Sequence, residues 1–96
     1  MELEVQPDVE GQRFFVVLEG QLSRLDYAPA GEKIWNFRST VVPPDQRGQG
    51  IASRIVQHAL EYAREHDIRV IPSCWFVKDF IAANPRFQML VAPPQH

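Results

Sequence analysis

The chain has 96 residues, of which 45% are hydrophobic and 10% aromatic, and this composition is typical of one globular domain. A formal net charge of −2 argues against a nucleic-acid-binding protein, because such proteins usually carry a basic face. No apolar run reaches the roughly 18 residues that span a membrane, and the acidic start at Met1–Glu4 is unlike a secretory signal. We therefore expect a single domain over residues 1–96 that acts away from nucleic acid and membranes.

The cysteine and histidine content argues against a disulfide and a metal site. Cys74 is the only cysteine, so the chain cannot form an intramolecular disulfide, and its histidines lack the spacing of a metal site. We expect no bound metal and a reducing, cytoplasmic setting.

The first half of the chain predicts strands joined by short turns. Runs rich in apolar and β-branched residues predict three strands, at residues 13–18, 21–27 and 34–42. Gly20 predicts the first turn, and residues 28–32, which contain Pro and Gly, predict a hairpin loop. Residues 3–5 are predicted to add an edge strand. Connections this short favour antiparallel pairing.

The apolar period changes to that of a helix between residues 49 and 66. The apolar side chains that recur on one helical face are Ile51, Ile55, Val56, Ala59, Leu60 and Ala63. This spacing predicts an amphipathic helix of about four turns, whose apolar stripe faces the core.

Two short elements and a tail complete the chain. Residues 68–71 predict a strand that Pro72 ends. Residues 76–83 predict a second helix that Pro85 closes, and residues 92–96 predict a frayed tail. A strand, a helix and a strand in succession predict a parallel pair with a right-handed crossover. The expected fold class is α/β (α+β): a mixed, mostly antiparallel sheet with one parallel β-α-β unit, one long helix and one short helix.

A glycine-spaced loop opens the long helix. The sequence from Val41 to Ala52 runs from a strand end, through two prolines and past Gly48 and Gly50, into the helix. Such a loop leaves backbone N–H groups unpaired at the positive end of the helix dipole, which makes an anion site of phosphate size. The sequence therefore predicts binding of a phosphorylated cofactor.

Three kinds of phosphate loop can be compared with this one. A nucleotide-hydrolysing P-loop needs a lysine after its last glycine, and here Ile51 follows Gly50. A dinucleotide-binding fingerprint needs a third glycine or alanine where Ser53 stands. The third pattern, R-x-x-G-x-A, is matched by Arg47, Gly50 and Ala52. An ordinary glycine-containing helix entry stays the plain alternative.

Cys74 comes just after the predicted strand at residues 68–71. The carboxyl ends of parallel neighbours lie on one edge of a sheet, and ligands bind at that edge. We therefore expect the thiol beside the glycine loop, as part of the site. The plain alternative is a small buried hydrophobe, which free cysteine often is.

These motifs resemble those of the GNAT superfamily of acyl-CoA-dependent N-acyltransferases. Residues 34–91 resemble its minimal, single-domain members of the N-acetyltransferase domain-containing protein 1 type. Their pattern is V-P-x-x-x-R-G-x-G-x-A, a helix, a strand ending in P-x-C, an aromatic helix and (H/N)-P. The matching residues here are Val42-Pro43, Arg47-Gly48, Gly50, Ala52, Pro72-Ser73-Cys74 and Asn84-Pro85.

The resemblance implies a splayed sheet that grips acetyl-CoA. It implies that the pyrophosphate is held by Arg47, Gly48, Gln49, Gly50, Ile51, Ala52 and Ser53. It also implies that backbone groups of Val41 and Val42 face the pantetheine arm and that Cys74 lies near the thioester. Asn84 either approaches the adenosine end of CoA or caps the end of the second helix. Many relatives carry a His-Thr pair where this chain has Ser39-Thr40, so a histidine base is unavailable here.

The expected function is acetyl transfer from acetyl-CoA to an amine, such as a protein lysine or a polyamine. Cys74 could attack the thioester and carry the acetyl group, which requires a thiolate, or it could give a proton to the departing CoA. The sequence does not choose between these roles. A second hypothesis is a module that binds acetyl-CoA or CoA without turnover and acts as a sensor. A third is an interaction protein that kept the fold and lost the cofactor.

Overall fold

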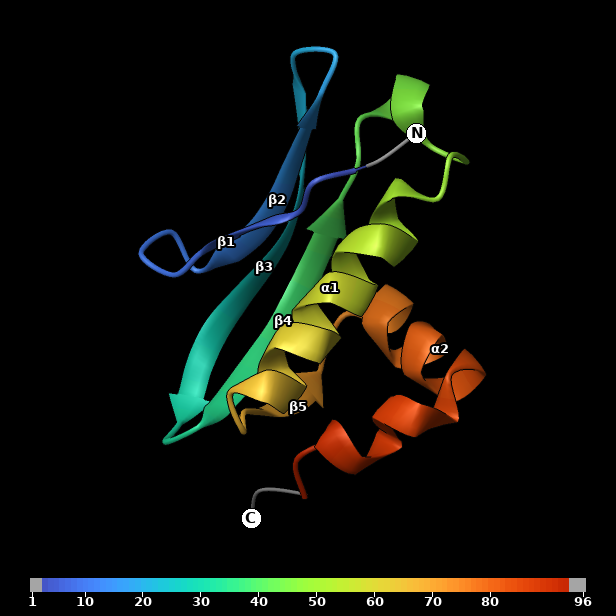
Figure 1. Cartoon of the computed structure of the whole chain (residues 1–96). Coiled ribbons are helices and arrows are strands. Elements are labelled where there is room, and N and C mark those ends of the chain that lie inside the picture. Colours follow the sequence, from blue (N-terminus) through green and yellow to red (C-terminus); the bar gives the residue numbers. More distant parts are fainter. Residues whose placement is uncertain (1–2, 94–96) are drawn as a thin grey trace.

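Five strands form one sheet in the computed structural model, which describes residues 3–93 (Figure 1). The strands are β1 (Gln6–Asp8), β2 (Arg13–Leu18), β3 (Gln21–Gly31), β4 (Ile34–Val41) and β5 (Arg69–Pro72). They lie side by side in chain order, with antiparallel pairing from β1 to β4 and parallel pairing between β4 and β5. The mixed, mostly antiparallel sheet that the sequence predicts is confirmed.

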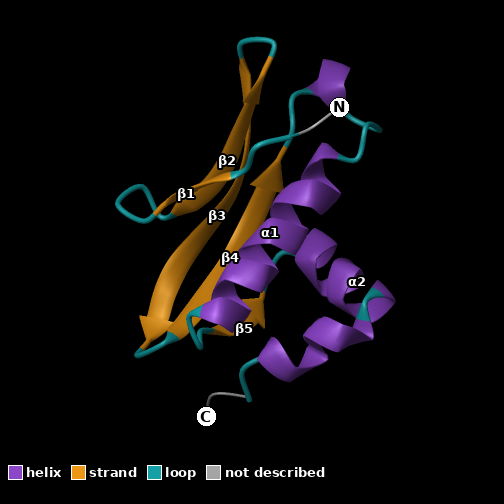
Figure 2. Cartoon of the chain, in the orientation of Figure 1, coloured by secondary structure: helices purple, strands orange, loops and turns teal. Residues whose placement is uncertain are grey.

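Helices complete the fold (Figure 2). Helix α1 (Ile51–Glu65) connects β4 to β5, and α2 (Trp75–Ala83) packs against α1 and β4. Two 3-10 segments flank them: η1 (Pro44–Gln46) precedes the glycine loop, and η2 (Pro85–Leu90) follows α2. The predicted β-α-β unit and the long and short helices are confirmed. No helix within residues 3–93 has the length and apolar character needed to cross a membrane.

The core lies between α1 and the sheet. Every apolar residue of the predicted helix stripe is buried, namely Ile51, Ile55, Val56, Ala59, Leu60 and Ala63. The sheet contributes Phe14, Leu25 and Phe37, none of which is more than 1% exposed. Full burial of a side chain such as Leu60 contributes roughly 1.5–3 kcal/mol. The stripe therefore fixes α1, and with it the start of the helix, against the sheet.

The predicted edge strand is wrong in position. It is β1 at Gln6–Asp8 rather than residues 3–5, and it pairs with β2. Pro7 lies within it, which hid the strand from sequence analysis. An edge strand tolerates proline because its outer side forms no ladder hydrogen bond.

The predicted hairpin loop at residues 28–32 is also wrong. Strand β3 continues to Gly31 and pairs with β4 as far as Ile34. The register shifts between Pro29 and Gly31, so the proline stands next to a bulge, where a missing N–H is tolerated. Long-range pairing with β4 thus overrides the local turn signals.

The predicted frayed tail is wrong at its first residue. The Ala92 N–H donates to the Val70 carbonyl at 2.8 Å, next to an isolated parallel bridge between Val70 and Val91. Residues 94–96 lie outside the described part of the chain.

The parallel strand pair opens toward its carboxyl ends. Strand β5 pairs with β4 only as far as Phe37, opposite Pro72, whereas residues 38–41 of β4 run on past the end of β5. The chain then turns into α2, and the Cys74 N–H donates to the Phe37 carbonyl at 2.9 Å. An opening is left between the end of β4 and the start of α2.

Candidate functional site

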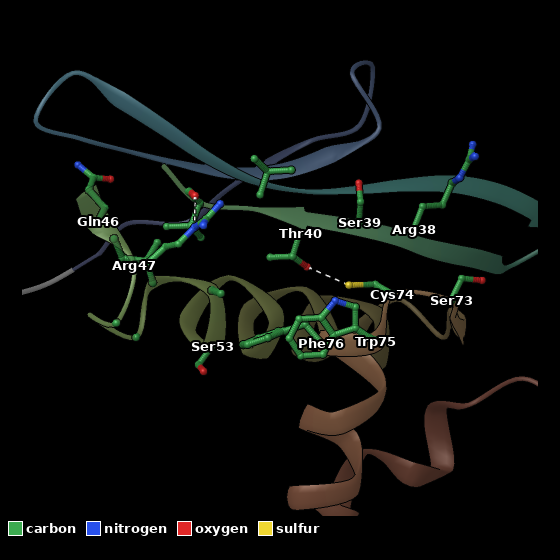
Figure 3. A pocket seen from close by; sticks show the side chains of 16 residues that line it. Arg38, Ser39, Thr40, Gln46, Arg47, Ser53, Ser73, Cys74, Trp75 and Phe76 are labelled. Carbon is green, nitrogen blue, oxygen red and sulfur yellow. Dashed lines mark hydrogen bonds between the residues drawn. The ribbon is translucent and has the colours of Figure 1, made fainter. Parts of the chain in front are cut away.

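A cleft of about 860 Å³ occupies this opening (Figure 3). Residues 38–42 at the end of β4 form one wall, and residues 73–76 at the start of α2 form the other. The loop and helix start at residues 46–53 bound one end, with Gln49 alone outside the lining. The cleft therefore joins the two regions that the sequence motifs single out.

The N-terminus of α1 opens onto the cleft. Its N-cap residue is Gly50, in the left-handed conformation with φ 79°, and no described side chain caps the first turn, which holds no acidic residue. The first N–H groups of a helix have no intrahelical partner, so Ile51, Ala52 and Ser53 can offer theirs to an anion. Gly48 also has a positive φ, of 83°. The loop thus has a conformation that glycine adopts readily, beside a site that favours negative charge.

Arg47 stands beside this helix end. Its Nε donates to the Val42 carbonyl at 3.2 Å, which ties the side chain to the end of β4. A guanidinium has several N–H donors, so the exposed group keeps others for an anion at the start of α1.

Cys74 lies toward the other end of the cleft, as the N-cap residue of α2 (Figure 3). Its side chain is 7% exposed, and its Sγ lies 3.5 Å from Oγ1 of Thr40 on β4. The sulfur therefore lies at the N-terminal end of α2, next to a hydroxyl of β4. The structure therefore places the thiol in the same cleft as the glycine loop and adds a hydroxyl partner for it.

Proton-exchanging groups are scarce in the cleft. None of the described residues that line it is Asp, Glu, His or Tyr. Cys74 is the lining side chain that is suited to exchange a proton. Within residues 3–93, no group of three or more His, Cys, Asp or Glu side chains is arranged to hold a metal ion.

Most residues predicted from the sequence line the cleft. They are Val41, Val42, Arg47, Gly48, Gly50, Ile51, Ala52, Ser53 and Cys74. Gln49 is exposed between the two glycines and is not part of the lining. Asn84 follows the far end of α2, where its Nδ2 donates to the Phe80 carbonyl at 2.9 Å. The structure thus separates Asn84 from the other predicted residues, and its bond matches the helix-end cap considered as the alternative.

Sequence reasoning assigned no role to Arg38, Thr40 or Gln46, which also line the cleft. Gln46 is 3% exposed, and its Nε2 donates to the Leu18 carbonyl at 2.8 Å. This bond holds η1 against the β2–β3 hairpin, and it joins residues 28 positions apart. Simple alternation along β4 from buried Phe37 would place Ser39 on the inner face, and the register shift at Arg38 places Thr40 there instead. No local pattern indicates the partner of Gln46.

Gln46→Ala should lower the free energy of unfolding by about 1–2 kcal/mol, because it leaves the partly buried Leu18 carbonyl without its donor. Chemical denaturation followed by circular dichroism measures the change. Gln49→Ala is the matched control, because this exposed neighbour should shift stability by no more than about 0.5 kcal/mol. Equal stability of the two variants would show that the bond to Leu18 contributes nothing.

Comparison with known proteins assigns the family. The sequence profile of the GCN5-related N-acetyl-transferase family matches residues 13–90, a range that includes the whole cleft. The chain belongs to this family. The match confirms the resemblance seen in the sequence motifs. GCN5-related N-acetyltransferases generally use acetyl-CoA.

Relatives from animals align with most of this chain. Protein NATD1 of Bos taurus is 34% identical over 90 residues, which cover 92% of this chain and 80% of that protein. Protein NATD1 of Homo sapiens is 32% identical, again over 92% of this chain and 80% of that protein. The solution structure of a GCN5-like protein from Staphylococcus aureus superposes with a TM-score of 0.74. It is 23% identical and covers 98% of this chain and 92% of that chain, which establishes a shared fold.

Proposed function

We propose that this protein is an acetyl-CoA-dependent N-acetyltransferase that transfers an acetyl group to an amine. The observation that carries the proposal is a single cleft that joins an uncapped helix N-terminus at Gly50 to a thiol at Cys74. The helix end favours a diphosphate, and the thiol is a group capable of acyl chemistry. Membership of the family supports the reaction class.

The residues at the start of α1 fit the diphosphate of coenzyme A. The space that a Cβ would fill at Gly48 and Gly50 is open, so a phosphate can approach the backbone closely. The amides of residues 51–53 and the guanidinium of Arg47 would hold it through charge-assisted hydrogen bonds. The cleft of about 860 Å³ is within the usual range for ligand pockets, roughly 300–1,000 Å³.

The remaining lining would orient the acyl end. When bound, acetyl-CoA supplies an activated acetyl thioester. Val41 and Val42 line the cleft between Arg47 and Cys74, where their backbone would hold the pantetheine arm. The Val42 carbonyl also accepts the bond from Arg47, so one strand end would position both the phosphate-binding side chain and the arm.

We propose that the Cys74 thiolate takes the acetyl group as a thioester with release of CoA, which takes up the proton that the thiol lost. An amine then takes the acetyl group and gives up a proton, which restores the Cys74 thiol. This role requires a thiolate, and the sulfur lies at the N-terminus of α2, 3.5 Å from Oγ1 of Thr40. Proton donation to the departing CoA thiolate is the alternative role for the same side chain. Either role needs an unoxidised thiol, and we infer a cytoplasmic location from that need.

A second candidate function is a module that binds acetyl-CoA or CoA without turnover. One observation favours it: no Asp, Glu, His or Tyr is found among the described lining residues, so no conventional general base faces an incoming amine. Such a protein would report cofactor levels rather than modify an acceptor.

A thermal-shift and calorimetry series tests the proposal. Acetyl-CoA at about 100 times its dissociation constant should stabilise the native state by about 2.7 kcal/mol. For a domain of this size, that gain raises the melting temperature by roughly 10–20 °C. ATP and NAD at the same concentration should leave it unchanged. If acetyl-CoA binds, release of free CoA across a panel of amines separates the enzyme from the sensor, and absence of binding rejects both.

Trp75 should report cofactor binding through its fluorescence. Its side chain is 72% exposed and lines the cleft, whereas Trp35 is stacked between Tyr27 and Tyr62 and does not line it. Covering Trp75 with the acyl end of acetyl-CoA should change its emission intensity and shift the maximum to shorter wavelength. Trp75→Phe should keep the fold and lose the response. A response of full size in that variant would place the ligand elsewhere.

A further inference from the structure

An irregularity in β4 places Arg38 between two cavities. The register with β3 shifts between Phe37 and Ser39, so Arg38 has no partner residue on β3. Arg38 and Ser39 line the cleft that contains Cys74, and they also line a second cavity of about 380 Å³. The β1–β2 turn and the middle of β3 bound this second cavity. Arg38 therefore stands where a molecule in the second cavity would meet the contents of the cleft.

The available charge at this junction is positive. Asp26 also lines the second cavity, but its carboxylate accepts from Arg24 Nε at 2.9 and 3.1 Å and from Ser39 Oγ at 3.2 Å. Arg38 is exposed, and its side chain forms no hydrogen bond or ion pair with any residue in the described part of the chain. The guanidinium is thus the group at the junction that still lacks a counter-ion.

Arg38 belongs to the thiol end of the cleft rather than to the phosphate end. The Cys74 N–H donates to the carbonyl of Phe37, the residue before Arg38. Figure 3 shows Arg38 and Arg47 at opposite ends of the cleft, with Thr40 and Cys74 between them. The Arg38 side chain points away from the helices, on the side of β4 opposite to Cys74 (Figure 3). A cofactor held at Arg47 would leave Arg38 free for another molecule.

We propose that Arg38 binds a carboxylate of the acceptor, so that the acceptor is an amine that carries its own carboxylate. This inference rests on the acetyl transfer proposed above and names the substrate class. A guanidinium pairs with a carboxylate through two parallel hydrogen bonds. A carboxylate held by Arg38 would place the acceptor at the junction of the two cavities, from which its amine can reach into the cleft that Arg38 also lines. A polyamine would meet an unpaired positive charge there.

Pairs of acceptors that differ only by the carboxylate test the idea. Lysine is compared with cadaverine, and histidine with histamine, in the wild-type protein with acetyl-CoA. The kcat/KM of the amino carboxylate should exceed that of its decarboxylated partner by roughly 10- to 100-fold, the discrimination expected of hydrogen bonds to a charged group. A preference for cadaverine or histamine would overturn the proposal.

Variants of Arg38 tie the preference to this residue. Arg38→Gln should bring the ratio within a pair close to one, Arg38→Lys should keep part of it, and Arg38→Glu should reverse it toward the diamine. Calorimetry with acetyl-CoA on each variant checks that the cofactor still binds, and the acceptor ratio is measured at saturating acetyl-CoA. Arg64→Gln, an exposed arginine in the last turn of α1, is the control that should leave the ratio unchanged. An unchanged ratio in Arg38→Gln would also overturn the proposal.

The outcomes separate this inference from the proposed function. Failure to bind acetyl-CoA rejects the proposed function and the inference that rests on it. Binding without turnover rejects only catalysis, and the acceptor pairs are then titrated into the complex with CoA and followed by amide NMR shifts. Shifts at Arg38 and Ser39 with lysine but not cadaverine would support the inference. Equal or larger shifts with cadaverine would overturn it while the cofactor site stands.

Discussion

Ser53→Glu should weaken the binding of acetyl-CoA strongly and leave the fold as stable as before. Ser53 lines the cleft in the first turn of α1, which holds no acidic residue. A carboxylate there is favourable to the helix, because it faces the positive end of the dipole. The same carboxylate would repel a bound diphosphate. Two unit charges about 4 Å apart interact by roughly 1–4 kcal/mol near a protein surface, so affinity should fall by roughly 10- to 1,000-fold.

Calorimetry with acetyl-CoA measures the loss, and thermal unfolding without ligand shows that the helix is intact. Gln88→Glu makes the same change of charge at an exposed position in η2, away from the cleft, and should leave affinity unchanged. Wild-type affinity in Ser53→Glu would mean that the phosphates do not bind at the start of α1, and the assignment of this helix end would fail.

Cys74→Ala should remove the acetyl group that the wild-type protein acquires from acetyl-CoA. The proposed acyl carrier is the only thiol in the chain, so intact-protein mass spectrometry should find one added acetyl group on the wild type and none on the variant. Turnover should fall by roughly 10²- to 10⁴-fold, which is the usual contribution of a positioned proton-transfer group and a lower limit for a nucleophile.

Matched variants separate the roles of the thiol. Cys74→Ser keeps a hydroxyl next to Thr40 but removes the sulfur, so it should retain little of the activity if the sulfur carries the acetyl group. Thr40→Val removes the partner 3.5 Å from Sγ and should slow acetylation of the protein without preventing it. Slow turnover in Cys74→Ala with no acetylated wild type would favour proton donation. Full turnover in Cys74→Ala would exclude both roles.

The parts of the fold that follow from local patterns were predictable. The stripe from Ile51 to Ala63 repeats with the period of a helix, and an apolar face of this kind is buried against the core. The glycine loop was predictable for a similar reason, since Gly48 and Gly50 both adopt a positive φ that other residues avoid. Local sequence therefore indicated the loop and helix start that we propose for phosphate binding.

The rest depends on residues that are distant in sequence. Pro29 is a residue type that predicts a turn, yet β3 continues through it because β4 pairs alongside. Thr40 and Cys74 are 34 positions apart, and no spacing rule indicates that their side chains meet. The sequence around Arg38 is that of an ordinary exposed arginine, and only the structure shows that a register shift places it between two cavities. Two of these features depend on the pairing of β3 with β4, and the third depends on the approach of α2 to β4.

The two walls of the cleft also lie on opposite sides of α1 in the chain. A nascent chain leaving the ribosome therefore presents the glycine loop before residues 73–76 exist to form the opposite wall. A fragment that ends within α1 would lack that wall of the cleft.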